Sequence, residues 1–254
     1  MNIRIPELIE KNVQGSWCPG CGHGIIVRLL AEAAEALGVE KRLVTVEDVA
    51  CGEFSQLTLH CDSIMTAHGR TIVTAAGVKR ALPNAVVVAH PGDGSAYSIG
   101  IESTIHCAYR NENILALVVN NSNFGMTGGQ MSPTTVPGMK TSSCIFGRDE
   151  EKNGRTLDIM KLLGDADAAY LARGSVDSPA EIAKTGRMIR KALEKQLRGE
   201  GFCLVEVLSP CPTNWHMTPA ASMEWIRNIQ KEHYPVGEFA DKKPENGTVG
   251  KEVG

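Results

Sequence analysis

Short apolar runs alternate along the chain with stretches that have helical periodicity. Runs rich in valine, isoleucine and leucine, bounded by turn residues, stand at 43–46, 85–89, 114–119, 170–173 and 202–208. Amphipathic helical spacing marks 25–37, 71–82, 95–110, 157–163, 179–198 and 220–232. Uninterrupted apolar runs joined by helices are typical of parallel strands buried on both faces. The pattern therefore predicts an α/β fold with a mostly parallel sheet and helices on both faces.

Polar residues follow two consecutive predicted strands. Asp93 stands between Gly92 and Gly94 after the run at 85–89, and Asn121 follows the next run. In a βαβ unit both loops emerge at one edge of the sheet, where open α/β folds bind ligands. Carboxylate and amide oxygens suit Mg²⁺, which completes its shell with water and phosphate oxygens. Each motif alone is an ordinary turn, but together at this spacing they favour a metal–diphosphate site.

Composition narrows the class of protein. The chain has 254 residues, of which 43% are hydrophobic, and a net charge of −3. This length predicts one large domain, residues 1–238, with a polar tail at 239–254. The acidic balance disfavours nucleic acid as a partner. No apolar run is long enough to span a membrane, and the N-terminus lacks the apolar core of a secretory signal, so we expect a cytoplasmic protein.

Four of the eight cysteines stand in loops where they could bind a metal. Cys18 and Cys21 form a C-x2-C pair, Cys51 follows the run at 43–46, and Cys211 precedes a proline after the last strand. Four thiolates suit structural zinc and an iron–sulfur cluster equally well. We expect the remaining thiols to be core or surface residues: Cys61, Cys107, Cys144 and Cys203.

Several motifs together resemble the β subunits of 2-oxoacid:ferredoxin oxidoreductases. They are CPGCGHG (18–24), HGR (68–70), GDG (92–94), GMTGGQMSPTT (125–135) and SPCPT (209–213). The resemblance covers nearly the whole chain and implies a thiamine diphosphate-binding fold. It also implies a [4Fe–4S] cluster on Cys18, Cys21, Cys51 and Cys211, because such a cofactor needs an electron acceptor nearby.

The resemblance assigns roles to further residues. Mg²⁺ would be bound by Asp93, Asn121 and the backbone carbonyl of Asn123. Thiamine diphosphate would be lined by Val49, Ala50, Cys51, Gly52, His68, Gly92, Gly94, Ser95, Gly125 and Met126. Catalytic roles would fall to His68, Met126 and Thr127. From the residues alone, His68 could instead cap the following helix, and His23 is better explained as a turn cap than as a ligand.

The activity that the resemblance implies is the coenzyme A-dependent oxidative decarboxylation of a 2-oxoacid, either 2-oxoglutarate or a branched-chain acid. An α subunit would supply the glutamate that activates thiamine, since Glu47, Glu53 and Glu102 stand in no supporting motif. A γ subunit or domain and a ferredoxin-like partner would complete the assembly. Two alternatives remain open: a non-oxidative thiamine diphosphate-dependent lyase or synthase subunit, and a zinc-stapled, non-catalytic scaffold. The polar loop 131–156 is long enough to be functional or to pack on a partner.

Overall fold

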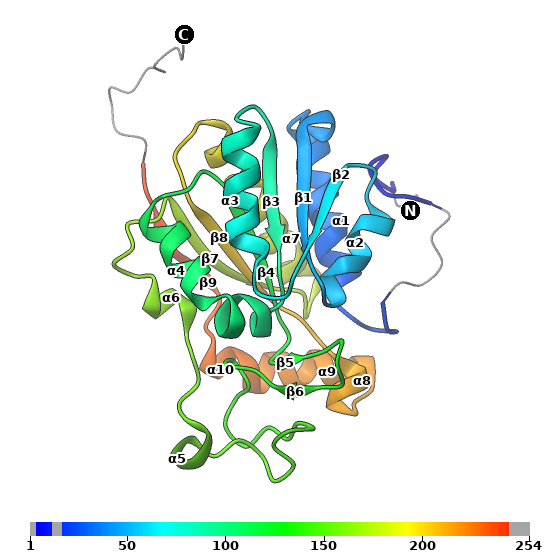
Figure 1. Ribbon diagram of the computed structural model, residues 1–254. Helices are drawn as coiled ribbons and strands as arrows, with labels where there is room; N and C mark the ends of the chain where they lie inside the picture. The colour runs from blue at the N-terminus through cyan, green and yellow to red at the C-terminus, as the bar shows by residue number, and fades with distance from the viewer. Residues whose placement is uncertain (1–3, 12–16, 244–254) are drawn as a thin grey trace.

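A seven-stranded sheet is the centre of the computed structural model, which describes residues 4–11 and 17–243 (Figure 1). Neighbouring strands are parallel, except that the last strand runs antiparallel to its neighbour. The predicted mostly parallel α/β fold is therefore confirmed. In spatial order the strands are β2 (Asp62–Thr66), β1 (Leu43–Asp48), β3 (Val86–His90), β4 (Leu115–Asn120), β8 (Cys203–Leu208), β7 (Tyr170–Ser175) and β9 (Gly237–Asp241).

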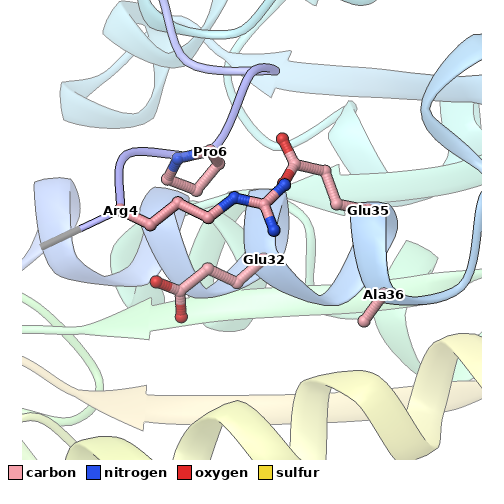
Figure 2. A pocket seen from close by; sticks show the side chains of 5 residues that line it. All are labelled: Arg4, Pro6, Glu32, Glu35 and Ala36. Carbon is pink, nitrogen blue, oxygen red and sulfur yellow. The ribbon is translucent and has the colours of Figure 1, made fainter.

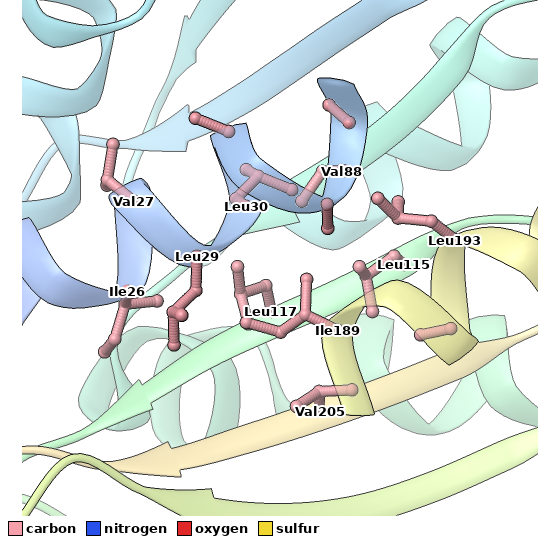
Figure 3. Close-up of a cluster of buried hydrophobic side chains, with 14 of the residues drawn as sticks. Ile26, Val27, Leu29, Leu30, Val88, Leu115, Leu117, Ile189, Leu193 and Val205 are labelled. Carbon is pink, nitrogen blue, oxygen red and sulfur yellow. The ribbon is translucent and has the colours of Figure 1, made fainter. Parts of the chain in front are cut away.

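One face of the sheet is covered by two long helices, α1 (His23–Ala36) and α7 (Pro179–Leu197). Leu30 of α1 and Ile189 of α7 belong to the same buried cluster as Leu117 of β4 (Figure 3). Burying such side chains is worth about 1.5–3 kcal/mol each. The helical periodicity in the sequence thus identified the apolar faces of α1 and α7 that pack on the sheet.

The other face carries α3 (Thr71–Ala81), α4 (Ile101–Tyr109) and the short α6 (Ile159–Leu162). Side chains alternate between the two faces of a strand. Val87 of β3 and Ala116 of β4 therefore pack in this second cluster, while their neighbours in each strand pack under α1 and α7. Helices on both faces explain why these strands are apolar throughout.

The helix expected at 95–110 is interrupted. A π-helical segment, η3 (Ser95–Ile99), precedes α4, and Gly100 separates the two. A Cβ atom at Gly100 would lie 2.5 Å from the carbonyl oxygen of Gly69 and 2.9 Å from that of Ser95. The break therefore comes from the close approach of the turn before α3, which hydrophobic periodicity does not detect.

The helix expected at 220–232 is also divided, into α9 (Pro219–Trp225), the π-helical η4 (Ile226–Gln230) and α10 (Lys231–His233). The π-helical turn ends at Gln230, whose side chain is buried against the loop after β4. Its Nε2 lies 3.0 Å from Ser122 Oγ and 3.3 Å from the carbonyl oxygen of Asn120. The irregular helix thus fixes a loop that carries predicted ligands.

Both edge strands went unpredicted. The segment 239–241, assigned to a polar tail, instead completes β9. Lys191 of α7 holds this strand through Glu238 at 2.7 Å and Asp241 at 2.6 Å. The strand is short and half exposed, so its composition resembles a loop. The rest of the predicted tail from residue 244, and residues 12–16 of the first cysteine loop, lie outside the described residues.

Small elements gather below the carboxyl ends of the strands, where Figure 1 shows β5 (Asn123–Phe124), β6 (Gln130–Met131) and α8 (Pro212–Trp215) beside α9. The buried guanidinium of Arg148 braces the loop 131–156 by donating hydrogen bonds to the carbonyls of Ser132, Thr135 and Arg155. No helix in the described parts of the chain is long and apolar enough to cross a bilayer. The remaining elements are η1 (Glu40–Arg42), η2 (Cys51–Phe54), α2 (Ser55–Thr58) and α5 (Glu150–Asn153).

Candidate functional site

Asp93 lies in the loop after β3, with 1% of its surface exposed. Its Oδ2 accepts a hydrogen bond from Ser132 Oγ at 2.6 Å and another from Thr134 Oγ1. Burial raises the pKa of this carboxyl group to about 6, although the two hydroxyl groups oppose the rise. The carboxylate is thus oriented by hydroxyl groups from the loop 131–156.

Three predicted ligand groups converge at this point. The terminal amide atom of Asn121 that faces Asp93 lies 3.1 Å from Asp93 Oδ1 and 2.7 Å from the carbonyl oxygen of Asn123. If this atom is the amide nitrogen, it donates hydrogen bonds to both oxygens. If it is the amide oxygen, three hydrogen-bond acceptors lie close together. Three converging oxygens are stable only around a cation, and hard oxygen donors are what Mg²⁺ prefers. The donor set therefore fits the predicted metal.

A small cavity of about 30 Å³, here called the central cavity, adjoins these groups. Its wall includes most of the predicted cofactor residues: Ala50, Cys51, Gly52, His68, Gly92, Gly94, Ser95 and Gly125. A Cβ atom at Gly94 would lie 2.6 Å from the ring of Phe124, so this ring packs directly on the Gly94 backbone. The loops after β1, β3 and β4 thus meet around one space, as parallel topology predicts.

Three predicted residues lie elsewhere. Val49 is 46% exposed and does not line the central cavity. Met126 lines a second cavity instead. Thr127 is exposed and donates a hydrogen bond from its hydroxyl group to Gln130 Oε1 at 2.7 Å. The structure therefore groups His68, but neither Met126 nor Thr127, with the predicted cofactor residues.

Sequence reasoning missed three residues of the central cavity: His23, Asp48 and Phe124. Asp48 is the last residue of β1, but the predicted strand ended at residue 46. With the correct strand end, the rule that polar residues at the carboxyl ends of parallel strands form the site would have identified Asp48 as it identified Asp93 and Asn121. His23 was interpreted as a turn cap. It is instead the buried first residue of α1, and burial lowers its pKa to about 3.

The four predicted ligand cysteines line one second cavity of about 260 Å³, here called the cysteine cavity. Burial, together with the neighbouring thiols, raises the pKa of Cys21 and of Cys51 to about 12. Two polar groups lie beside the sulfurs: Cys21 Sγ is 3.2 Å from His23 Nδ1, and Cys211 Sγ is 3.5 Å from Asn214 Nδ2. The chain thus brings together four thiols that are far apart in sequence.

The other four cysteines do not line this cavity. Cys107 and Cys203 are buried in the hydrophobic clusters, as expected for core residues. Cys144 lies beside Asn153, with its Sγ 3.5 Å from the Oδ1 atom. Within residues 4–11 and 17–243, no three or more His, Cys, Asp or Glu side chains are arranged to hold a single metal ion.

The two cavities share a wall made of Cys51, Asn121 and Gly125. A Cβ atom at Gly125 would lie 3.3 Å from Cys51 Sγ and 3.4 Å from Asn121 Nδ2. Glycine at this position therefore lets the thiol and the amide approach each other. The residues predicted for a metal–diphosphate site and the four predicted cysteine ligands thus lie next to each other in one chain.

The candidate acids are placed differently. Glu47 is buried, and its Oε2 lies 3.1 Å from His90 Nδ1. Glu102 is exposed and pairs with Arg70. Neither lines the central cavity, and neither does Glu53, so among the described residues Asp48 is the acid in its wall.

A hollow of about 310 Å³ lies apart from this region, between the segment 4–6 and α1 (Figure 2). Arg4 reaches across it to Glu35, at 3.4 Å. Exposed ion pairs of this kind contribute about 0–1 kcal/mol. The hollow contains none of the chemistry predicted from the sequence.

The fold and the site define a class of thiamine enzymes. A family model described as "Thiamine pyrophosphate enzyme, C-terminal TPP binding domain" matches residues 48–207, which include the central cavity from Asp48 onwards. The 2-oxoglutarate:ferredoxin oxidoreductase from Magnetococcus marinus, solved with 2-oxoglutarate, coenzyme A and succinyl-CoA bound, has the same fold with a TM-score of 0.75. The two sequences are 25% identical, and the matched region covers 96% of this chain and 87% of the Magnetococcus marinus chain.

Curated relatives narrow this class. The ketoisovalerate oxidoreductase subunit VorA of Methanothermobacter thermautotrophicus is 39% identical over 90% of this chain and 48% of its own length. The 2-oxoglutarate synthase subunit KorB of Archaeoglobus fulgidus is 36% identical over 83% of this chain and 75% of its own length. The chain therefore belongs to the family of β subunits of 2-oxoacid:ferredoxin oxidoreductases. It spans about half the length of the ketoisovalerate relatives.

Proposed function

We propose that this chain is the β subunit of a coenzyme A-dependent 2-oxoacid:ferredoxin oxidoreductase that acts on 2-oxoglutarate or a branched-chain 2-oxoacid. The observation that carries the proposal is the wall shared by the two cavities, made of Cys51, Asn121 and Gly125. Oxidative decarboxylation needs an electron sink and an electron acceptor close together. The names of the relatives supply the substrate class.

The residues around the central cavity would hold Mg²⁺ and thiamine diphosphate. Asp93, Asn121 and the Asn123 carbonyl would bind the metal, and the backbone at Gly92 and Gly94 would approach the diphosphate. When bound, the cofactor supplies an electron sink for the carbon that loses CO₂. The protein's part is to fix the metal, orient the substrate and exclude water. Ser132 and Thr134 serve this purpose by holding the Asp93 carboxylate in place.

The cysteine cavity would hold a [4Fe–4S] cluster on Cys18, Cys21, Cys51 and Cys211. Four thiolates suit structural zinc and an iron–sulfur cluster equally well. The cluster is favoured because oxidation would need an electron acceptor beside the thiamine site, and the cysteine cavity shares a wall with the central cavity. Electrons would pass from the central cavity through the shared wall to this cluster.

The active enzyme would include other subunits. No glutamate lines the central cavity among the described residues, which supports an α subunit that supplies the activating carboxylate. A γ subunit or domain and a ferredoxin-like partner would complete electron transfer. The two other candidate functions differ in cofactor content: a non-oxidative thiamine enzyme would need no iron, and a zinc scaffold would bind no thiamine.

The proposal is tested by purifying the chain with its partner subunits under anaerobic conditions. We expect reduction of a viologen dye that depends on both coenzyme A and one 2-oxoacid. Parallel assays with 2-oxoglutarate, 2-oxoisovalerate and pyruvate identify the substrate. Decarboxylation without dye reduction would support the lyase instead, and no turnover of any 2-oxoacid by a thiamine-loaded complex would contradict the proposal.

A further inference from the structure

The buried Asp48 and the half-buried His68 form a pair in the wall of the central cavity. Asp48 ends β1 with none of its surface exposed, and its Oδ1 lies 3.1 Å from His68 Nδ1. The other carboxylate oxygen, Oδ2, is buried and has no hydrogen-bond partner among the described residues. Leaving a buried carboxylate oxygen without a partner destabilises the fold. Such an atom is therefore expected where a functional site requires it.

His68 is held in place from three directions. The backbone N–H of the next residue, Gly69, donates to Ser95 Oγ at 2.9 Å. Gly69 has φ of +77°, and a Cβ atom there would lie 2.9 Å from the backbone nitrogen of Gly100. The imidazole ring packs on Phe124, with the ring centroids 5.6 Å apart. The turn is thus fixed on the helix that begins at the metal-binding loop.

The pair determines which nitrogen of His68 carries a proton. An ionised carboxylate can only accept hydrogen bonds, so Nδ1 must carry the hydrogen that Asp48 binds. Nε2 is then the nitrogen left to act on a bound molecule. His90 makes a similar contact with Glu47, but its ring does not line the cavity and its buried Nε2 has no partner among the described residues. Of the two histidine–carboxylate pairs compared here, Asp48–His68 therefore combines this chemistry with access to the cavity.

We propose that Asp48 is a positioning residue that fixes the tautomer of His68, so that the unprotonated His68 Nε2 accepts a proton from the oxygen on the reacting carbon of the 2-oxoacid. The inference rests on the proposed function. After CO₂ has left, the reacting carbon carries a hydroxyl group. As the acyl carbonyl group forms, the O–H bond breaks, its electron pair becomes part of the C=O bond, and Nε2 takes the proton. Two electrons would leave for the proposed cluster in the same oxidation, and the proton on Nε2 then passes to solvent.

The tautomer is measured by NMR on the full-length chain with ¹⁵N-labelled histidine, and His68→Gln identifies the His68 signals. We expect the Nδ1–H form in the unmodified chain and a shift toward the Nε2–H form in Asp48→Asn. Asp62→Asn is the matched control, because this aspartate is exposed on the neighbouring strand β2. An Nε2–H tautomer in the unmodified chain would overturn the inference even if the variant fails to fold.

Kinetics of the assembled complex provide the second readout. General acid–base catalysis contributes about 10²–10⁴-fold. We expect Asp48→Asn to lower kcat by about 10²-fold or more, with KM for the 2-oxoacid and the thiamine and iron contents unchanged. Asp62→Asn should match the unmodified complex. Full activity of Asp48→Asn would remove the pair from the mechanism and leave the proposed function intact, whereas an unmodified complex without 2-oxoacid turnover would contradict that function itself.

Discussion

At the residue scale, the position of a polar residue relative to the ends of the strands determines whether it can contribute to the site. Asp93 and Asn121 could be predicted because residues that follow parallel strands meet at one edge of the sheet. The hydroxyl groups of Ser132 and Thr134 could not be assigned to Asp93, because they come from a loop without periodicity. His23 was missed because the beginning of α1 contains glycines that resemble a turn.

Asp93→Ala tests the metal site. We expect the variant to lose thiamine diphosphate on purification, because the proposed Mg²⁺ site would lose its charged ligand, while circular dichroism shows an unchanged fold. Asp165→Ala is the matched control, since this aspartate is exposed and distant in sequence. Thiamine content equal to that of the unmodified complex would remove Asp93 from the metal site.

At the element scale, the buried strands and long helices followed from hydrophobic pattern alone. The exceptions have physical causes. The edge strands β2 and β9 lack a continuous apolar run because part of each is exposed. The π-helical segments η3 and η4 depend on neighbours distant in sequence, namely Gly69 beside Gly100 and the loop after β4 beside Gln230. Local propensity contains no information about such contacts.

Gly100→Ala tests the cause of the first interruption. The added Cβ atom would lie 2.5 Å from the carbonyl oxygen of Gly69, and overpacking of this kind costs about 1–3 kcal/mol of unfolding free energy. Gly77→Ala in α3 is the matched control. No atom of the described residues lies within 4 Å of its added Cβ, and alanine should stabilise the helix by up to about 1 kcal/mol. Urea denaturation compares the variants, and equal stabilities would contradict the packing argument.

At the scale of the whole molecule, the topology brings loops from β1, β4 and β8 together with the first cysteine loop. The sequence alone left zinc and an iron–sulfur cluster open, because residue types do not determine how far apart four thiols lie. The resemblance to the family favoured the cluster, and the wall that the cysteine cavity shares with the central cavity supports the same choice. The proposed function therefore depends above all on the adjacency of the central cavity and the cysteine cavity within one subunit.

The most direct test is the iron, zinc and thiamine content of the anaerobically purified complex of this chain with its α subunit. We predict about four iron atoms and about one thiamine diphosphate per chain, without zinc. Cys211→Ser should lose the iron and retain thiamine, whereas Cys144→Ser, which lies outside the cysteine cavity, should retain both. Zinc in place of iron, or full iron content in Cys211→Ser, would contradict the account.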